Sequence, residues 1–452
     1  MRSFIRALVL SVLAFSLPLS PAHAFCGFFV GKADAQLFNS ASQVALVRQG
    51  DRTVLTMSND YKGEARDFAL VVPVESVLQK EQIHIGDRKL LERLDAYSSP
   101  RLVEYTDANP CERVYYDQRK RAAAPRSQMD AAPPSPERSH ALGVKVEAQY
   151  TVGEYDIVVL SATESNGLET WLLESGYKIP PASAAALAPY VKQGMKFFVA
   201  KVNLKERAAN GYQELRPIQI AYESPRFMLP IRLGMANSAG TQDLIVYLLT
   251  QRGRVESTNY RTVKIPSDKE IPEYVQSDFG PFYKATFAES LRRESWRALF
   301  TEYFWDMGSC DPCSADPLSR EELTQLGVFW LDESPAPTRP GRGRRPPGFG
   351  GGSSAVLTRL HVRYDSEHFP EDLQFQETGD RQNFQARYIV RHQASGDLSC
   401  EEGKRYQAEL RSRHGREAQT LAELTGWSAE SIGQKMPREA PEKDQWWKRI
   451  WK

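Results

Sequence analysis

The alternation of apolar and polar residues predicts a chain built mostly from β-strands. Runs rich in Val, Leu and Thr are separated by short turns that contain Gly, a pattern typical of β-hairpins. The predicted hairpins join residues 43–48 to 53–58, 144–152 to 155–161, 195–203 to 212–222, and 244–250 to 256–265. Residues 68–74 are continuously apolar, which predicts a strand covered on both faces. Further strands are predicted at 356–364 and 383–392.

Helical patterns are fewer. Apolar spacing and cap residues predict helices at 166–176, 181–192, 279–304 and 402–424, and one more after the capping box of Ser319 and Glu322. Five aromatic residues within or next to the third pattern are read as core, with a glycan or peptide groove as the alternative: Trp296, Phe300, Tyr303, Phe304 and Trp305. The fold class predicted is α+β, mainly antiparallel β hairpins and sheets with a few short helices and two disordered linkers.

The two predicted linkers lie where apolar periodicity is lost. Residues 119–140 are rich in Ala, Pro, Arg and Ser, and residues 334–354 hold five Pro, six Gly and four Arg. Such segments bury too little apolar surface to offset the entropy of the chain. A basic contact for an anionic surface is the alternative for the second segment. The expected organisation is a signal peptide at 1–24, a β-rich part at 25–118, a linker at 119–140, a central α+β domain at 141–333, a linker at 334–354, an α+β segment at 355–428, and a tail at 429–452.

The first 24 residues have the pattern of a secretory signal peptide. Arg2 and Arg6 precede an apolar stretch, and Ala22 and Ala24 have the spacing of a cleavage site. An uncleaved anchor is the alternative, but the apolar stretch is shorter than the roughly 20 residues that span a bilayer. A lipoprotein needs a small residue before Cys26, and Phe25 stands there. We therefore expect export to the periplasm or cell envelope. Removal of the two arginines changes the net charge from +1 to −1, which gives no electrostatic case for nucleic acid as a partner.

All five cysteines follow the predicted signal peptide, and in an oxidising compartment they are disulfide candidates: Cys26, Cys111, Cys310, Cys313 and Cys400. An odd number leaves at least one thiol free or paired between chains. Cys310 and Cys313 have the CxxC spacing of a structural disulfide, a redox pair or half a metal site. The structural disulfide is favoured, because Asp311 disfavours a thiolate and the next helix signal begins only at Ser319.

No motif of catalysis is present. The chain has no His-Glu-x-x-His, P-loop, nucleophile elbow or dinucleotide fingerprint, so no catalytic residue, resident metal or cofactor is predicted. His361, Asp365 and His368 form the one candidate metal group, and they would need a turn to bring both imidazoles together. At the C-terminus, Trp446, Trp447 and Trp451 are typical of a membrane-surface contact, of packing against the body of the protein, or of a frayed end.

Several stretches in combination resemble one family. They are CGFFV at 26–30, MSNDY at 57–61, DFALVVPV at 67–74, SPRLVEY at 99–105 with NPC at 109–111, ESPRFMLPIRL at 223–233, and CDPC at 310–313. From about residue 25 to 332, and loosely to 427, the chain resembles the exported bacterial proteins grouped as "domain of unknown function 2330". The resemblance implies export and framework roles for Cys26, Cys111, Cys310 and Cys313. It implies no activity or ligand.

The function predicted from these observations is an exported, non-catalytic binding or structural protein of the periplasm or envelope, with a partner that the sequence does not identify. Two alternatives stay open. One is a thiol–disulfide redox protein that uses Cys310 and Cys313, and the other is a metal-dependent hydrolase around His361, Asp365 and His368.

Overall fold

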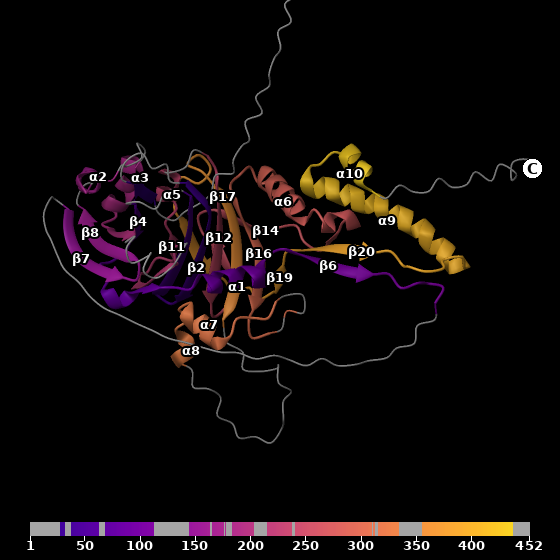
Figure 1. Cartoon of the computed structure of the whole chain (residues 1–452), viewed down its shortest axis with the longest axis horizontal. Coiled ribbons are helices and arrows are strands. Elements are labelled where there is room, and N and C mark those ends of the chain that lie inside the picture. The colour runs from indigo at the N-terminus through magenta and orange to yellow at the C-terminus, as the bar shows by residue number, and fades with distance from the viewer. Residues whose placement is uncertain are drawn as a thin grey trace, which may run out of the picture.

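The fold is α+β, as predicted, and Figure 1 shows its sheets and helices. The structure is a computed structural model. It describes residues 28–31, 38–62, 68–112, 144–162, 165–175, 177, 183–202, 215–236, 240–309, 311, 315–333 and 355–436. The two predicted linkers, the predicted signal peptide and the three C-terminal tryptophans lie outside the described residues.

The largest sheet contains nine strands among the described residues. Their spatial order is β14 (Arg261–Lys264), β16 (Ala298–Asp306), β17 (Val356–Tyr364), β12 (Gln242–Thr250), β2 (Phe38–Gln49), β3 (Arg52–Lys62), β10 (Ile218–Glu223) and β5 (Ile83–Ile85), with β19 (Phe384–Gln385) beside β16. Most neighbours are antiparallel, but β12 pairs with β2, and β14 with β16, in parallel. Strands from all three predicted structured parts therefore share one sheet.

A second, antiparallel sheet packs face to face on the first. Its order is β1 (Phe28–Gly31), β4 (Phe68–Val74), β9 (Lys196–Val202), β8 (Tyr155–Ala162) and β7 (Val144–Val152). Leu70 on β4 and Phe198 on β9 share one buried cluster with Leu46 on β2 and Val246 on β12. The neighbours Ala69 and Val71 face the opposite side and are equally buried. The prediction that strand 68–74 is covered on both faces is therefore confirmed.

Helices cover the outer face of each sheet. Over the five-stranded sheet lie α2 (Ser165–Glu174), α3 (Ser183–Lys192) and α5 (Arg232–Ala236), which share its outer core. Over the nine-stranded sheet lie α1 (Arg88–Ser98), α7 (Arg320–Gln325) and α8 (Trp330–Glu333). The capping box predicted for α7 is present, since Glu322 N donates to Ser319 Oγ and Ser319 N donates to Glu322 Oε2. The central body thus has four layers, helix–sheet–sheet–helix.

A smaller unit, the C-terminal unit, extends from the end of the large sheet formed by β14 and β16 (Figure 1). Its strands are all parallel, in the order β15 (Lys269–Glu270), β20 (Arg387–His392) and β6 (Arg101–Thr106). Its helices are η2 (Glu273–Gln276), α6 (Phe279–Arg293), α9 (Glu401–Thr425) and α10 (Ala429–Lys435). Phe282, Tyr388 and Leu421 lie in its core. A further small sheet consists of β11 (Met228–Leu229), β18 (Leu373–Glu377) and β13 (Val255–Ser257), and η1 (Lys80–Gln82) precedes β5.

Two predicted hairpins are confirmed and two are wrong. β2 and β3 pair across Gly50, and β7 and β8 pair across Gly153, each glycine having a positive φ. By contrast, β9 and β10 lie in different sheets, although they flank the Asn210–Gly211 signal, which is outside the described residues. β12 also does not fold back on the strands after Gly253, because β13 pairs with β18 and β14 pairs with β16.

The helix predicted at 279–304 is also wrong in its second half. α6 ends at Arg293, and Ser295 and Trp296 have φ values of 53° and 62°, which right-handed helix does not allow. The chain then enters β16, where Phe300, Tyr303 and Phe304 are at most 1% exposed. These aromatic residues are core, as favoured, but they belong to a strand.

Among the helices of the described residues, none reaches both the length and the apolarity of a membrane span.

Candidate functional site

Two of the five cysteines are joined in the structure. Cys111, just after β6, forms a disulfide with Cys400, which caps the N-terminus of α9. Cys26, Cys310 and Cys313 lie outside the described residues. The three interpretations of the CxxC motif therefore stay predictions.

The two histidines of the candidate metal group have separate partners. His368 lies in the turn after β17, and its Nδ1 is 2.9 Å from Asp365 Oδ1. His361 lies within β17, and its Nδ1 is 2.7 Å from Glu302 Oε1. In the part of the chain that the structure describes, no group of three or more His, Cys, Asp or Glu could hold a metal ion.

His361 belongs instead to a polar stripe across the nine-stranded sheet. Arg359, His361 and Arg363 alternate along β17, so their side chains project from one face. On β12, Asp243 is the direct cross-strand partner of Arg363, and Tyr247 is the partner of Arg359. The Arg363 guanidinium donates two hydrogen bonds to Asp243, at 2.7 and 2.8 Å.

Glu302 enters this stripe through an irregularity in β16. The register between β16 and β17 shifts between Thr301 and Tyr303, so Glu302 is the extra residue of a β-bulge. The Glu302 side chain is fully buried, and Arg359 Nε donates to it at 2.6 Å. The hydroxyl of Tyr283 on α6 donates to the other carboxylate oxygen, which also contacts His361.

Electrostatics keep this buried group charged. Burial alone would raise the pKa of Glu302, but the positive charges of His361 and Arg359 lower it to about 2. Burial alone would lower the pKa of His361, but Glu302 and Asp243 raise it. The ring of Phe287 from α6 stacks on the imidazole with centroids 3.6 Å apart.

The stripe fastens helices to the sheet. Arg359 Nη1 donates to Asp95 on α1 at 2.6 Å, while Tyr283 and Phe287 bring α6 to the same place. Sequence reasoning selected His361 but missed Glu302, Arg359 and Asp243. The alternation Arg-x-His-x-Arg inside a predicted strand is the signal that marks part of the stripe. No local signal marks Glu302.

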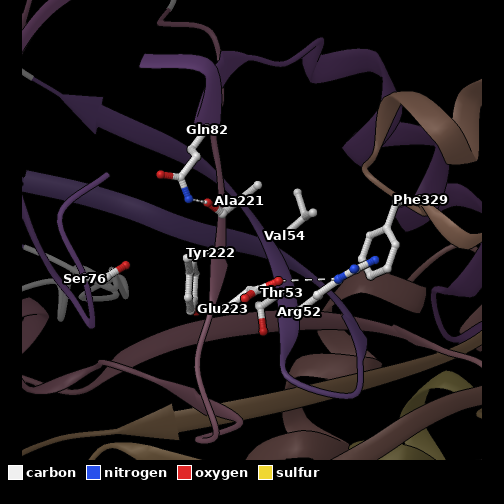
Figure 2. A pocket seen from close by; sticks show the side chains of 9 residues that line it. All are labelled: Arg52, Thr53, Val54, Ser76, Gln82, Ala221, Tyr222, Glu223 and Phe329. Carbon is white, nitrogen blue, oxygen red and sulfur yellow. Dashed lines mark hydrogen bonds and ion pairs between the residues drawn. The ribbon is translucent and has the colours of Figure 1, made fainter. Parts of the chain in front are cut away.

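A separate open hollow of about 610 Å³ lies where β3 begins and β10 ends (Figure 2). It is lined by Arg52, Thr53, Val54, Ser76, Gln82, Ala221, Tyr222, Glu223 and Phe329. Ala221 packs toward the core under the helices, and its neighbour Tyr222 packs toward the core between the sheets. Because neighbouring residues of a strand face opposite sides, the hollow reaches both faces of β10 and must pass around its edge or end.

The edge of β10 is only partly covered at this hollow. β10 pairs with β3 as far as Glu223, but with β5 only as far as Ile220, opposite Ile83. The next carbonyl, that of Ala221, accepts from the side-chain Nε2 of Gln82 at 2.8 Å instead of from a strand. Figure 2 shows this amide facing Ala221. The N–H and C=O groups of every second residue in a strand point to the same side. Those of Glu223 therefore point to the same side as those of Ala221, where β5 no longer covers the edge.

The rim of the hollow is charged and aromatic. Arg52 Nε lies 3.5 Å from Glu223 Oε1, and both side chains are exposed, at 58% and 76%. The Arg52 guanidinium also lies 6.0 Å from the centre of the Phe329 ring (Figure 2). The site therefore combines an uncovered strand end with an apolar wall and two opposite charges.

Comparison with known proteins identifies a family. Neither the curated proteins nor the solved structures gave a significant match. The family model described as "Uncharacterized protein conserved in bacteria (DUF2330)" matches residues 20–376, which is most of the chain and includes every residue that lines the hollow. The chain belongs to this family.

Proposed function

We propose that this protein is an exported, non-catalytic binding protein, and that its ligand is an extended peptide segment held in the hollow beside β10. The observation that carries the proposal is the end of β10. The outward main-chain groups of Glu223 lie at an open hollow that β5 does not reach, while the Ala221 carbonyl is already held by the side chain of Gln82.

The shape and chemistry of the hollow favour a peptide. An extended segment laid beside an uncovered strand gains main-chain hydrogen bonds, and pockets on either side receive its alternate side chains. Glu223 supplies an outward N–H and C=O, while Phe329 and Tyr222 supply apolar walls. A volume of about 610 Å³ is in the range of pockets that hold drug-sized ligands.

Export is supported by two features far apart in the chain. The first 24 residues have the charge, apolar stretch and cleavage spacing of a signal peptide. The disulfide between Cys111 and Cys400 is of a kind that persists in oxidising compartments.

N-terminal sequencing of protein from the periplasmic or secreted fraction should begin at Phe25. Recovery only from the cytosol with Met1 intact would contradict export.

Peptide binding is tested with a library of N-acetylated, C-amidated pentapeptides, read by native mass spectrometry on the protein that starts at Phe25. We expect a subset to bind the wild type. Glu223→Pro removes the outward N–H without touching the pairing of β10 with β3, and proline is tolerated at a strand edge. This variant should bind at least about fivefold more weakly, as expected for the loss of one ladder hydrogen bond.

The matched control is Glu223→Ala, which removes the carboxylate but keeps the N–H, and should retain most of the affinity. Phe329→Ala should weaken binding through the loss of the apolar wall. Binding by Glu223→Pro that equals the wild type would rule out strand addition. A library of which no member binds would rule out the peptide ligand.

A further inference from the structure

The Cys111–Cys400 disulfide holds one end of α9. Cys111 lies in the turn that follows β6, and Cys400 is the N-cap residue of α9. Gly403 N donates to Cys400 Sγ at 3.2 Å. Both cysteines are partly exposed, so a small dithiol or a partner protein can approach the bond. Cys400 also lies after the end of the family match at residue 376.

The two halves of α9 are held differently. In the C-terminal half, Leu421 and Leu424 are buried in the core of the C-terminal unit, against α6 and α10. In the N-terminal half, residues 401–416, the only buried residue is Gly403. None of the hydrophobic clusters of the described residues includes a side chain from this half.

Polar contacts also attach the N-terminal half, two of them to one aspartate and another between Gln393 Nε2 and His414 Nε2, which are 3.3 Å apart. Asp107, just after β6, accepts from the Tyr406 hydroxyl and from Arg413 Nη1, each at 2.7 Å. The Tyr406 hydroxyl in turn accepts from Ala394 N at 2.9 Å. The neutral hydrogen bond at Ala394 contributes about 1 kcal/mol, and the ion pair of Arg413 with Asp107, whose side chains are 14% and 15% exposed, contributes about 1.5–3 kcal/mol. The disulfide, at about 2–4 kcal/mol, is the strongest single constraint on this half.

We propose that Cys111–Cys400 is a thiol-exchange site, and that its reduction by a dithiol detaches the N-terminal half of α9 from β6 while the C-terminal half stays packed. This inference concerns another part of the molecule than the peptide site and does not depend on it.

The exchange has a preferred direction. A thiolate of the dithiol attacks Cys111 Sγ, the S–S bond breaks, and the electron pair leaves on Cys400 Sγ. There the N-terminus of α9 and the Gly403 N–H stabilise the negative charge. The second thiol of the dithiol then displaces Cys111 as a thiolate. The dithiol becomes a disulfide, and both cysteines end as thiols after taking up two protons and two electrons.

Charges in the first turn of α9 oppose this direction in part. Glu401 and Glu402 disfavour a thiolate at Cys400, but Lys404 Nζ lies 2.6 Å from Glu401 and offsets that charge. If the helix N-terminus outweighs these charges, the attacking thiol will bond to Cys111, and the position of the mixed disulfide measures this preference. Brief treatment with glutathione, followed by quenching and mass mapping, should find the mixed disulfide mainly on Cys111. A mixed disulfide mainly on Cys400 would refute the assigned direction.

Detachment is tested by hydrogen exchange on the full mature chain, oxidised and after reduction by dithiothreitol under native conditions. Amide exchange in residues 400–416 should accelerate at least tenfold on reduction, and exchange in 417–425 should change little. The double variant Cys111→Ser with Cys400→Ser should reproduce the reduced pattern and become insensitive to dithiothreitol. That insensitivity separates this bond from any formed by Cys26, Cys310 or Cys313.

Two results would overturn the proposal. One is a bond that dithiothreitol reduces only after the protein is unfolded by urea. The other is equal protection of residues 400–416 in the oxidised and reduced proteins. Because the reduced wild type is measured directly, the test remains decisive even if the double variant fails to fold.

Discussion

How much an ion pair contributes to stability depends on whether both of its side chains are buried. Glu302 has no exposed surface, yet it stays ionised because two cationic side chains and a hydroxyl surround it. Glu401 on α9 also has a close cationic partner, Lys404, but both are solvated. Water screens the second pair and leaves the first almost unscreened. The same residue type is therefore structural in one place and nearly neutral in the other.

Replacing Glu302 by glutamine keeps its shape and removes its charge. Arg359 and His361 are then buried beside a neutral amide, and breaking a buried pair of this kind costs about 3–5 kcal/mol of unfolding free energy. Urea denaturation of Glu302→Gln should show this loss, while Glu401→Gln should unfold much like the wild type. Equal midpoints for the two variants would show that the buried network adds no stability.

Glu417 on α9 gives the C-terminal unit a dependence on pH. Burial raises its pKa to about 7, with Glu270 and Asp107 adding to the rise and Arg413 and Arg416 opposing it. The folded state then binds more protons than the unfolded state between pH about 4.5 and 7. Stability should therefore fall as pH rises through this window, by at most about 3 kcal/mol. In the variant Glu417→Gln, the free energy of unfolding measured between pH about 4.5 and 7 should no longer fall with rising pH. An unchanged fall would show that a residue other than Glu417 causes it.

At the scale of elements, one glycine lets α7 end directly above β3. Gly327 has a φ of +91°, and a Cβ at this position would lie 2.5 Å from Val54 Cγ1. Gly327→Ala should therefore lower the unfolding free energy by more than about 1 kcal/mol, through both backbone strain and overpacking. In α9, a Cβ on Gly415 would meet no atom within 4 Å, so Gly415→Ala should raise stability by up to about 1 kcal/mol. Thermal unfolding of both variants checks the contrast, which a stabilised Gly327→Ala would contradict.

At the scale of the whole molecule, stability rests on the core between the two sheets. Leu70 is 2% exposed and lies among side chains from both sheets. Leu70→Asp places an unpaired carboxylate there and should cost several kcal/mol, enough to prevent stable folding. Leu173→Asp is the matched change at a side chain 53% exposed, and it should leave the soluble yield unchanged. Normal yield of folded Leu70→Asp would refute the two-sheet core.

The sequence by itself determined the features that depend on neighbours a few residues apart. The turns at Gly50 and Gly153, the capping box of α7, strand β17 and helix α9 all follow from local conformation and periodicity. Tertiary structure alone decided the parallel pairing of β6 with β20, the position of Glu302 in the polar stripe, and the uncovered end of β10. It also joined Cys111 to Cys400, which are 289 residues apart. The physical reason is that burial and strand pairing bring together residues distant in the chain, and a local pattern carries no information about which distant strand or cysteine will be the neighbour.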